Sequence, residues 1–141
     1  MSGNTEQHSG SAAGDWSKMG LELVDGVYAI CRMDAHAPVP DTVYGPGLVS
    51  ITRTADELSI VCPQYRAPSE AVVQSSWACI QVKGPLDFGL TGVLAGLADP
   101  LARAGISIFA TSTFDTDYVL VRCADLERAL AVLSDAGHFV V

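Results

Sequence analysis

The sequence predicts an α+β fold, and three observations support this prediction. Two runs rich in β-branched and aromatic residues, Ile106–Thr111 and Tyr118–Val121, have the character of paired strands. Residues 92–104 carry apolar side chains at helical spacing. Strand-like and helix-like segments follow one another in the order β-α-β-β-α-β over Trp77–Val141.

Length and charge restrict the classes of protein that need to be considered. At 141 residues the chain forms one domain or two small subdomains sharing a core, and 49% hydrophobic residues suffice for a sizeable core. A formal net charge of −8 argues against nucleic acid or an anionic membrane as partner. No apolar run approaches the roughly 20 residues that span a bilayer, and the N-terminus lacks a signal-peptide pattern. We therefore expect a cytoplasmic protein.

The first half of the chain contains short predicted elements. Residues 1–18 are rich in Ser, Gly, Asn and Gln without periodicity, so we expect a disordered or loosely attached tail. A first strand follows at Val27–Arg32. Three prolines and two glycines then leave Asp34–Gly47 room for no more than a short helical turn, around Asp41–Tyr44.

A predicted hairpin and a brief helix complete this half. The hairpin has strands Val49–Arg53 and Leu58–Cys62 around a polar turn. Pro68–Val73 follows as a brief helix, capped by Ser69 or by the preceding turn. Trp77–Val82 is the next strand.

The second half begins with the clearest predicted helix, residues 92–104, with Thr91 as its N-cap. Pro100 lies inside the apolar pattern and should bend this helix or split it at Asp99, because proline lacks the amide proton and crowds the preceding turn. Gly105 is expected at the helix C-terminus.

The two β-type runs named above then predict an antiparallel hairpin around a polar break. A second helix should open at Asp125, bury an apolar stripe and end at Gly137. Phe139–Val141 closes the chain as a short strand.

The order β-α-β-β-α-β is the ferredoxin-like plan, and the first half repeats it imperfectly. Leu58–Val61 aligns with Tyr118–Val121, which sets Glu57 against Asp117. We therefore predict an internal duplication: two ferredoxin-like halves, residues 19–75 and 76–141, packed side by side, the first with a shortened first helix.

Metal and cofactor sites are not expected. The four cysteines are widely spaced and contain no C-x-x-C pair: Cys31, Cys62, Cys79 and Cys123. Free cysteines in predicted strands pack as small hydrophobes. The three histidines are scattered, and we expect surface or strand-edge positions for them: His8, His36 and His138.

The junction of the second hairpin concentrates hydroxyl and carboxylate side chains: Ser112, Thr113, Asp115, Thr116 and Asp117. Strands on both sides would fix these groups at the edge of a sheet, where they could hold a small polar ligand. Asp and Thr also favour turns because they hydrogen-bond locally, so a solvated turn is the alternative.

Over Leu90–Val121 (LTGVLAGLADPLARAGISIFATSTFDTDYVLV) the sequence resembles an ACT domain. More narrowly, it is similar to tandem ACT-domain proteins related to the aspartate kinase regulatory region and to the CASTOR-type arginine sensors. The resemblance covers Gly84–Val141 and extends more weakly to about Val27. It implies a small regulatory protein that senses a free amino acid at the interface of two ACT-like halves, without catalysis.

The resemblance also implies which residues bind the ligand. The first group lies before and at the start of the helix: Asp87, Leu90, Thr91, Gly92 and Val93. The second group is the hairpin junction: Ser112, Thr113, Phe114, Asp115, Thr116 and Asp117. Amides at the helix start would take a ligand carboxylate. Asp117 occupies the acidic position of the arginine sensors and would bind an ammonium or guanidinium group, whereas Asp115 stands where those sensors commonly carry a neutral residue.

Three functional hypotheses follow. The first is the amino-acid sensor, with a homodimer or a partner protein left open. The second is an enzyme. The sequence contains no nucleophile–base pair, phosphate loop or metal cluster, so we do not expect catalytic activity. The third is an oligomerisation or interaction module without a small-molecule ligand, in which Gly92 only permits close packing of helix on sheet.

Overall fold

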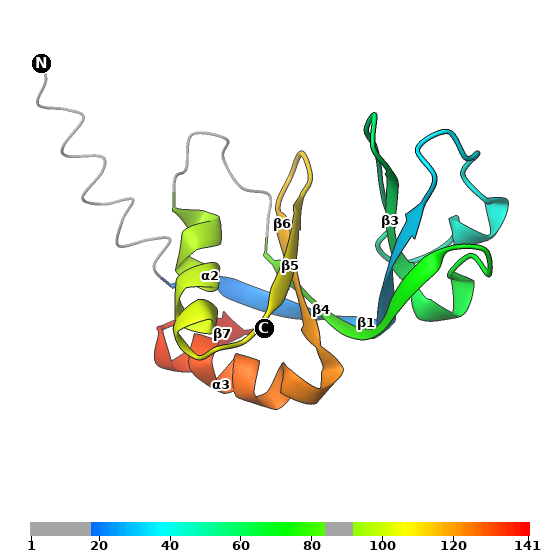
Figure 1. Ribbon diagram of the computed structural model, residues 1–141. Coiled ribbons are helices and arrows are strands. Elements are labelled where there is room, and N and C mark those ends of the chain that lie inside the picture. Colours follow the sequence, from blue (N-terminus) through cyan, green and yellow to red (C-terminus); the bar gives the residue numbers. More distant parts are fainter. Residues whose placement is uncertain (1–17, 84–91) are drawn as a thin grey trace, which may run out of the picture. The chain divides into compact units, whose positions relative to one another are not determined.

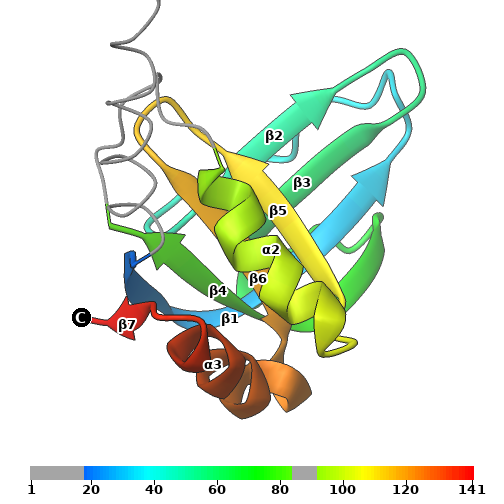
Figure 2. The ribbon, with the colours of Figure 1, turned by 90° about the vertical axis from the view of Figure 1, so that its left-hand side faces the viewer.

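The computed structural model describes residues 18–83 and 92–141, which form an α+β structure (Figures 1 and 2). Residues 1–17, which make up nearly all of the predicted tail, lie outside the described residues. No helix within the described ranges is long and apolar enough to cross a membrane. In chain order the elements are β1 (Gly20–Met33), the 3-10 helix η1 (Asp41–Val43), β2 (Ser50–Arg53), β3 (Leu58–Pro63), the 3-10 helix η2 (Gln64–Arg66), β4 (Val72–Val82), α2 (Val93–Arg103), β5 (Ile108–Ser112), β6 (Asp117–Arg122), the 3-10 helix η3 (Cys123–Asp125), α3 (Leu126–Asp135) and β7 (Phe139–Val140).

The chain divides into two units. The N-terminal unit is Val24–Cys79, and the C-terminal unit comprises Ile80–Val141 together with the segment that ends at Leu23. The long strands β1 and β4 each pass through both units, because the divisions fall inside these strands.

In the N-terminal unit the hydrogen-bonded strand order is β2-β3-β1-β4. β1 and β3 are antiparallel, with Tyr28 opposite Pro63 and Met33 opposite Leu58. The element order along the chain is β-3-10-β-β-3-10-β, so single 3-10 turns stand where the C-terminal unit has α-helices. The short helical turn expected around Asp41–Tyr44 is confirmed as η1.

Two predictions for this unit are wrong. The first strand is much longer than Val27–Arg32, because it begins at Gly20. The brief helix expected at Pro68–Val73 is absent; a turn closed by the Ala71 amide on the Pro68 carbonyl at 3.3 Å leads directly into β4. The β-branched Val72 and Val73 favour the extended conformation over the cap-like Pro-Ser-Glu pattern before them.

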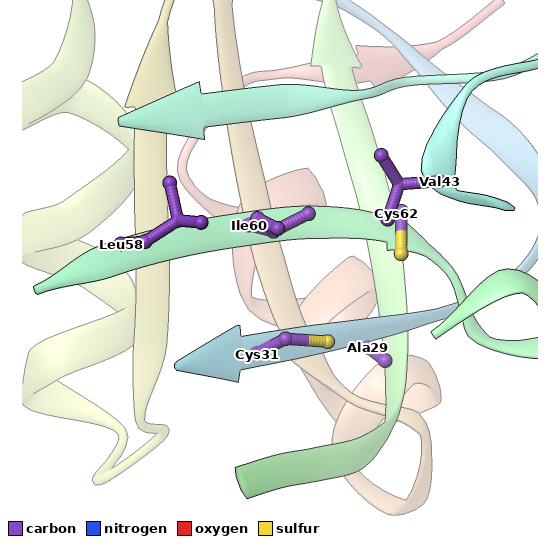
Figure 3. Packing of buried hydrophobic residues seen from close by; sticks show 6 residues of the cluster. All are labelled: Ala29, Cys31, Val43, Leu58, Ile60 and Cys62. Carbon is purple, nitrogen blue, oxygen red and sulfur yellow. The ribbon is translucent and has the colours of Figure 1, made fainter. Parts of the chain in front are cut away.

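The core of the N-terminal unit is built from small and branched aliphatic side chains and two thiols (Figure 3): Ala29, Cys31, Val43, Leu58, Ile60 and Cys62. A hydrogen bond with Cys62, together with burial, raises the pKa of the Cys31 thiol. Burial also raises the pKa of Cys79 to about 12. Cys31, Cys62 and Cys79 are all buried and free, which confirms their expected packing role.

Two arginines hold the proline-rich segment that replaces a helix. The Arg66 guanidinium donates to the carbonyls of Val43 at 3.2 Å and Pro46 at 2.6 Å. Arg53 donates to the carbonyls of Ala35 and Ala37. Because prolines remove donors from this segment, side-chain guanidinium groups supply hydrogen bonds that a helix would make with its own backbone.

The C-terminal unit has the predicted order β-α-β-β-α-β, formed by β4, α2, β5, β6, α3 and β7. Its strands are ordered β1-β4-β6-β5, and β7 pairs in parallel with the start of β1. α2 contacts α3, and α3 also contacts β6 and β7. The predicted apolar stripe of α2 is confirmed at Val93, Leu97 and Leu101, which are buried, whereas Leu94, also expected in the stripe, is exposed.

The prediction that Pro100 splits its helix at Asp99 is wrong, because α2 runs without interruption to Arg103. The alternative, a bend at Pro100, stays a prediction. Proline has no amide proton, so the Gly96 carbonyl one turn earlier loses its usual donor. The His138 ring supplies the replacement, with Nε2 lying 2.8 Å from that carbonyl. Nδ1 of the same ring accepts the Met19 amide at 3.1 Å, which assigns the proton to Nε2.

His138 is therefore a buried structural residue, only 4% exposed, and the expectation of a surface position for it is wrong. Its ring joins the start of the described chain to α2 from a position directly before β7.

Candidate functional site

Hydrogen bonds between Thr113 and Thr116 close the β5–β6 turn. Ser112 and Asp117 form the last residue pair of the hairpin, and the turn between them is Thr113–Thr116. The Thr113 amide donates to the Thr116 carbonyl at 2.8 Å, and the Thr113 hydroxyl accepts the Thr116 amide at 3.3 Å. These bonds fix the conformation of the turn without a glycine.

Thr116 fastens this turn to the neighbouring strand. Its side chain is buried, and its hydroxyl donates to the carbonyl of Val82, the last residue of β4, at 2.6 Å. The chain leaves β4 at Lys83 and is described again from Gly92, at the start of α2. The hairpin turn therefore lies beside the end of β4, where the intervening segment begins.

Asp117 presents a carboxylate at the rim of the hairpin. The Ser112 hydroxyl donates to its Oδ1 at 2.5 Å, which orients the carboxylate. Neither Asp117 nor the exposed Asp115 has an ion-pair partner among residues 18–83 and 92–141. Phe114, at the tip of the turn, is 79% exposed. This end of the hairpin is thus acidic and open to solvent.

The start of α2 offers unused backbone donors. Gly92 is the N-cap residue, with a φ of 81° in the left-handed region that glycine adopts without strain, and no side chain caps the helix. The first helical bond runs from the Gly96 amide to the Gly92 carbonyl at 2.9 Å. The preceding amides, Val93 among them, have no acceptor within the helix. The prediction that Thr91 is the N-cap is wrong, because that position is held by Gly92.

The structure places the predicted ligand residues in two groups and leaves three outside. Asp87, Leu90 and Thr91 lie outside the described residues. The start of α2 and the β5–β6 turn lie at the same end of the C-terminal unit in both views (Figures 1 and 2). The Val93 side chain and the Thr116 hydroxyl are already buried in the fold, so at these positions only backbone groups remain for a ligand.

The β2–β3 hairpin contains the same turn. There the Thr54 amide donates to the Glu57 carbonyl at 2.9 Å, and the Thr54 hydroxyl accepts the Glu57 amide at 3.2 Å. The last residue pair before this turn is Arg53 and Leu58. Thr54 thus corresponds to Thr113.

This correspondence corrects the predicted alignment by one residue. Leu58, not Glu57, corresponds to Asp117, and Asp56 corresponds to Asp115. Matching the two apolar runs gave the wrong register, because the half-buried Tyr118 counts as apolar in sequence but is not a core position.

The two hairpins differ at the first residue after the turn, which is Asp117 in the second hairpin and Leu58 in the first. Leu58 is completely buried at that place, and Arg53 replaces Ser112 and is engaged with the loop carbonyls of Ala35 and Ala37. The nearby Glu57 carboxylate lies 3.9 Å from Arg32. The aspartate of the turn recurs in both hairpins, whereas the Ser112–Asp117 pair exists only in the second.

Other chemistry has little support in the described part of the chain. No group of three or more His, Cys, Asp or Glu side chains there is arranged to hold a metal ion. Cys123, which lies outside the predicted strands, is exposed. The sequence interpretation missed the Thr116 hydroxyl as an anchor and His138 as a buried link, since both act on backbone carbonyls distant in sequence.

Comparisons with known proteins match two parts of the chain to family models. The family model for ACT domains matches residues 72–135, and a second family model, described as an N-terminal domain, matches residues 26–70. The chain is 37% identical over 101 residues to the cytosolic arginine sensor for mTORC1 subunit 1 of Bos taurus; the match covers 62% of this chain and 31% of that protein. The chain thus spans less than a third of the length of this curated relative.

Two solved structures extend the comparison. An X-ray crystal structure of a protein from Agobacterium tumefaciens is 43% identical, with a TM-score of 0.83, and the match covers 88% of this chain and 92% of that one. The ligand-free regulatory subunit of aspartate kinase from Thermus thermophilus is 14% identical, with a TM-score of 0.57 over 84% of this chain and 98% of that one, and so shares the fold alone. Over residues 72–135 the chain thus matches the ACT-domain family.

Proposed function

We propose that this protein is a regulatory module that binds a free amino acid and performs no chemistry on it. The observation that carries the proposal is the Asp117 carboxylate, oriented by Ser112 and without a cationic partner among the described residues. An oriented carboxylate without a cation is suited to an ammonium or guanidinium group. Relatedness to a cytosolic arginine sensor supports this assignment and a cytoplasmic location.

The start of α2 supplies the complementary half of the proposed site. Its uncapped amides, at Gly92 and Val93, would receive the α-carboxylate of the amino acid, helped by the positive end of the helix dipole. Asp87, Leu90 and Thr91 belong to the segment leading into this helix and are proposed as further contacts. Thr113, Phe114 and Thr116 would shape the site through the turn they form.

Only one of the two hairpins is proposed to bind. The β2–β3 hairpin has a buried Leu58 where the second hairpin has Asp117. It therefore lacks the carboxylate on which the proposal depends. We infer one amino-acid site per chain.

Calorimetric titration of an Asp117→Ala variant tests the site. A charge-assisted hydrogen bond contributes about 1.5–3 kcal/mol, so the variant should bind its amino acid about ten- to a hundredfold more weakly. Asp115→Ala is the matched control, because an aspartate recurs at this turn position in the hairpin proposed not to bind. Arg, Lys, Thr and Phe form the first panel of ligands.

The pattern of affinities identifies the group that Asp117 contacts. Equal losses for all four ligands would indicate contact with the α-amino group, and a larger loss for Arg or Lys would indicate the side chain. Equal effects of the Asp117 and Asp115 variants would refute the assignment of the site. If no amino acid binds the unmodified protein, the alternative is an oligomerisation or interaction module without a small-molecule ligand.

A further inference from the structure

Two buried thiols of the N-terminal unit come from neighbouring strands. Cys31 lies in β1 and Cys62 in β3, and the antiparallel register places Cys62 opposite Ala29, two residues before Cys31. Because side chains alternate between the two faces of a strand, Ala29, Cys31 and Cys62 share one face of the sheet. The two cysteines are therefore diagonal neighbours, and we call them the thiol pair.

The side chains of the thiol pair point toward each other (Figure 3). Cys31 is 1% exposed and Cys62 is completely buried, and both belong to the apolar core of this unit. Ala29 carries only a methyl group, which leaves space beside it for the sulfur of Cys31. The Cys31 thiol donates a hydrogen bond to the Cys62 sulfur. The fold thus brings two thiols into contact within an apolar core.

The two members of the pair differ in acidity. The hydrogen bond from Cys31 lowers the pKa of Cys62 against the opposing effect of burial, and the positive charge of Arg66 lowers it further. The same hydrogen bond and burial raise the pKa of Cys31. Since the thiolate is the reactive form of cysteine, Cys62 is suited to act as the nucleophile and Cys31 as the second thiol.

Cys79 provides a contrast within the same chain. It is also completely buried, but it is not a member of the core cluster that contains the thiol pair. Burial alone raises its pKa to about 12. A buried thiol without an acidifying partner is inert, so burial and thiol chemistry are separable in this protein.

We propose that the thiol pair is a site of reversible oxidation by hydrogen peroxide, at which a disulfide forms between Cys31 and Cys62. The Cys62 thiolate attacks one peroxide oxygen and the O–O bond breaks, which gives a sulfenic acid at Cys62 and a hydroxide that is protonated to water. The Cys31 sulfur then attacks the Cys62 sulfur. The S–O bond breaks as the S–S bond forms, and the hydroxyl leaves with the Cys31 proton as a second water. The two thiols thereby give two electrons to the peroxide.

Burial and register favour a small oxidant and a reducible product. Hydrogen peroxide is little larger than water, so it reaches a buried sulfur through small local openings of the fold. Diagonal neighbours lie farther apart than directly opposite residues, so a disulfide between them is strained. Strained disulfides are readily reduced, which makes the oxidation reversible. The proposal concerns the N-terminal unit and does not depend on amino-acid binding.

Peroxide treatment of a full-length Cys123→Ser chain tests the proposal, because this variant lacks the exposed thiol and keeps the core unchanged. Trypsin cleaves after Arg32 and Arg53, so the disulfide links residues 19–32 to residues 54–66 in an unreduced digest. Mass spectrometry should show this linked peptide forming at least about tenfold faster than Cys79 is oxidised. Dithiothreitol should separate the two peptides again.

Single variants in the same background assign the two roles. In Cys31→Ala the oxidation should stop at the sulfenic acid of Cys62, which dimedone traps, whereas Cys62→Ala should leave Cys31 reduced. Circular dichroism and melting verify that both variants are folded. The proposal is overturned if the folded Cys123→Ser chain yields no linked peptide, if the link forms no faster than Cys79 is oxidised, or if it forms only after unfolding in urea.

Discussion

The Pro100–His138 arrangement makes a quantitative prediction about stability. His138→Ala removes the donor to the Gly96 carbonyl and the acceptor of the Met19 amide, and the ring is almost completely buried. Leaving a buried polar group unpaired costs about 1–3 kcal/mol, so the loss of both bonds should lower the free energy of unfolding by roughly 2–5 kcal/mol.

Restoring the backbone donor should weaken this effect. In a Pro100→Ala variant the amide of residue 100 can bond to the Gly96 carbonyl, as in an ordinary helix. In that background His138→Ala leaves only the Met19 amide unpaired and should cost about 1–2 kcal/mol less than in the unmodified protein. Urea unfolding of the four proteins in this double-mutant cycle measures the coupling.

A distant pair provides the control. Tyr28→Phe removes the hydroxyl that accepts the Leu48 amide at 2.9 Å in the other unit. Its cost should add to that of Pro100→Ala within about 0.5 kcal/mol, because the two sites share no partner. Additivity between Pro100→Ala and His138→Ala would refute the inference that His138 replaces the missing backbone donor.

Two further predictions concern the N-terminal unit and the thiols. Gly47→Ala should destabilise the protein by about 1–3 kcal/mol, because Gly47 has a φ of 94° and an added Cβ would lie 2.8 Å from the Tyr28 hydroxyl. Gly26→Ala is its control, with a φ of 95° but nothing within 4 Å; equal losses on urea unfolding would show that strain alone accounts for the effect. Alkylation of the native protein near pH 8 should label one thiol per chain quickly, at the exposed Cys123, since Cys79 has a pKa of about 12 and Cys31 and Cys62 are buried. Mass spectrometry showing rapid labelling at any buried cysteine would contradict the packing.

The elements of the C-terminal unit could be predicted because their patterns are local. The stripe Val93, Leu97 and Leu101 defines α2, and the β-branched runs around Thr113–Thr116 define the hairpin. In the N-terminal unit, Pro68–Val73 combines residues typical of a helix N-terminus with β-branched valines that favour a strand. In the structure the valines belong to the strand β4, so the predicted helix does not form.

Two features could not be predicted from local pattern. The continuity of α2 through Pro100 depends on His138, which is 42 residues from Gly96 in sequence. The register of the repeat depends on the hydrogen bonds of Thr54 and Thr113, whereas the sequence comparison could match only apolar runs. The resemblance that indicated the candidate site identified Asp117, but the structure was needed to show that Leu58 holds the equivalent place in the first hairpin.

Titration of the unmodified protein with each of the twenty amino acids tests the central claim most directly. The account predicts one bound amino acid per chain by calorimetry. At a hundred times the dissociation constant the ligand should stabilise the protein by about 2.7 kcal/mol and raise the melting temperature by roughly 5–10 °C. Two molecules bound per chain would contradict the restriction to the second hairpin, and the absence of binding by all twenty at millimolar concentration would contradict the sensor function itself.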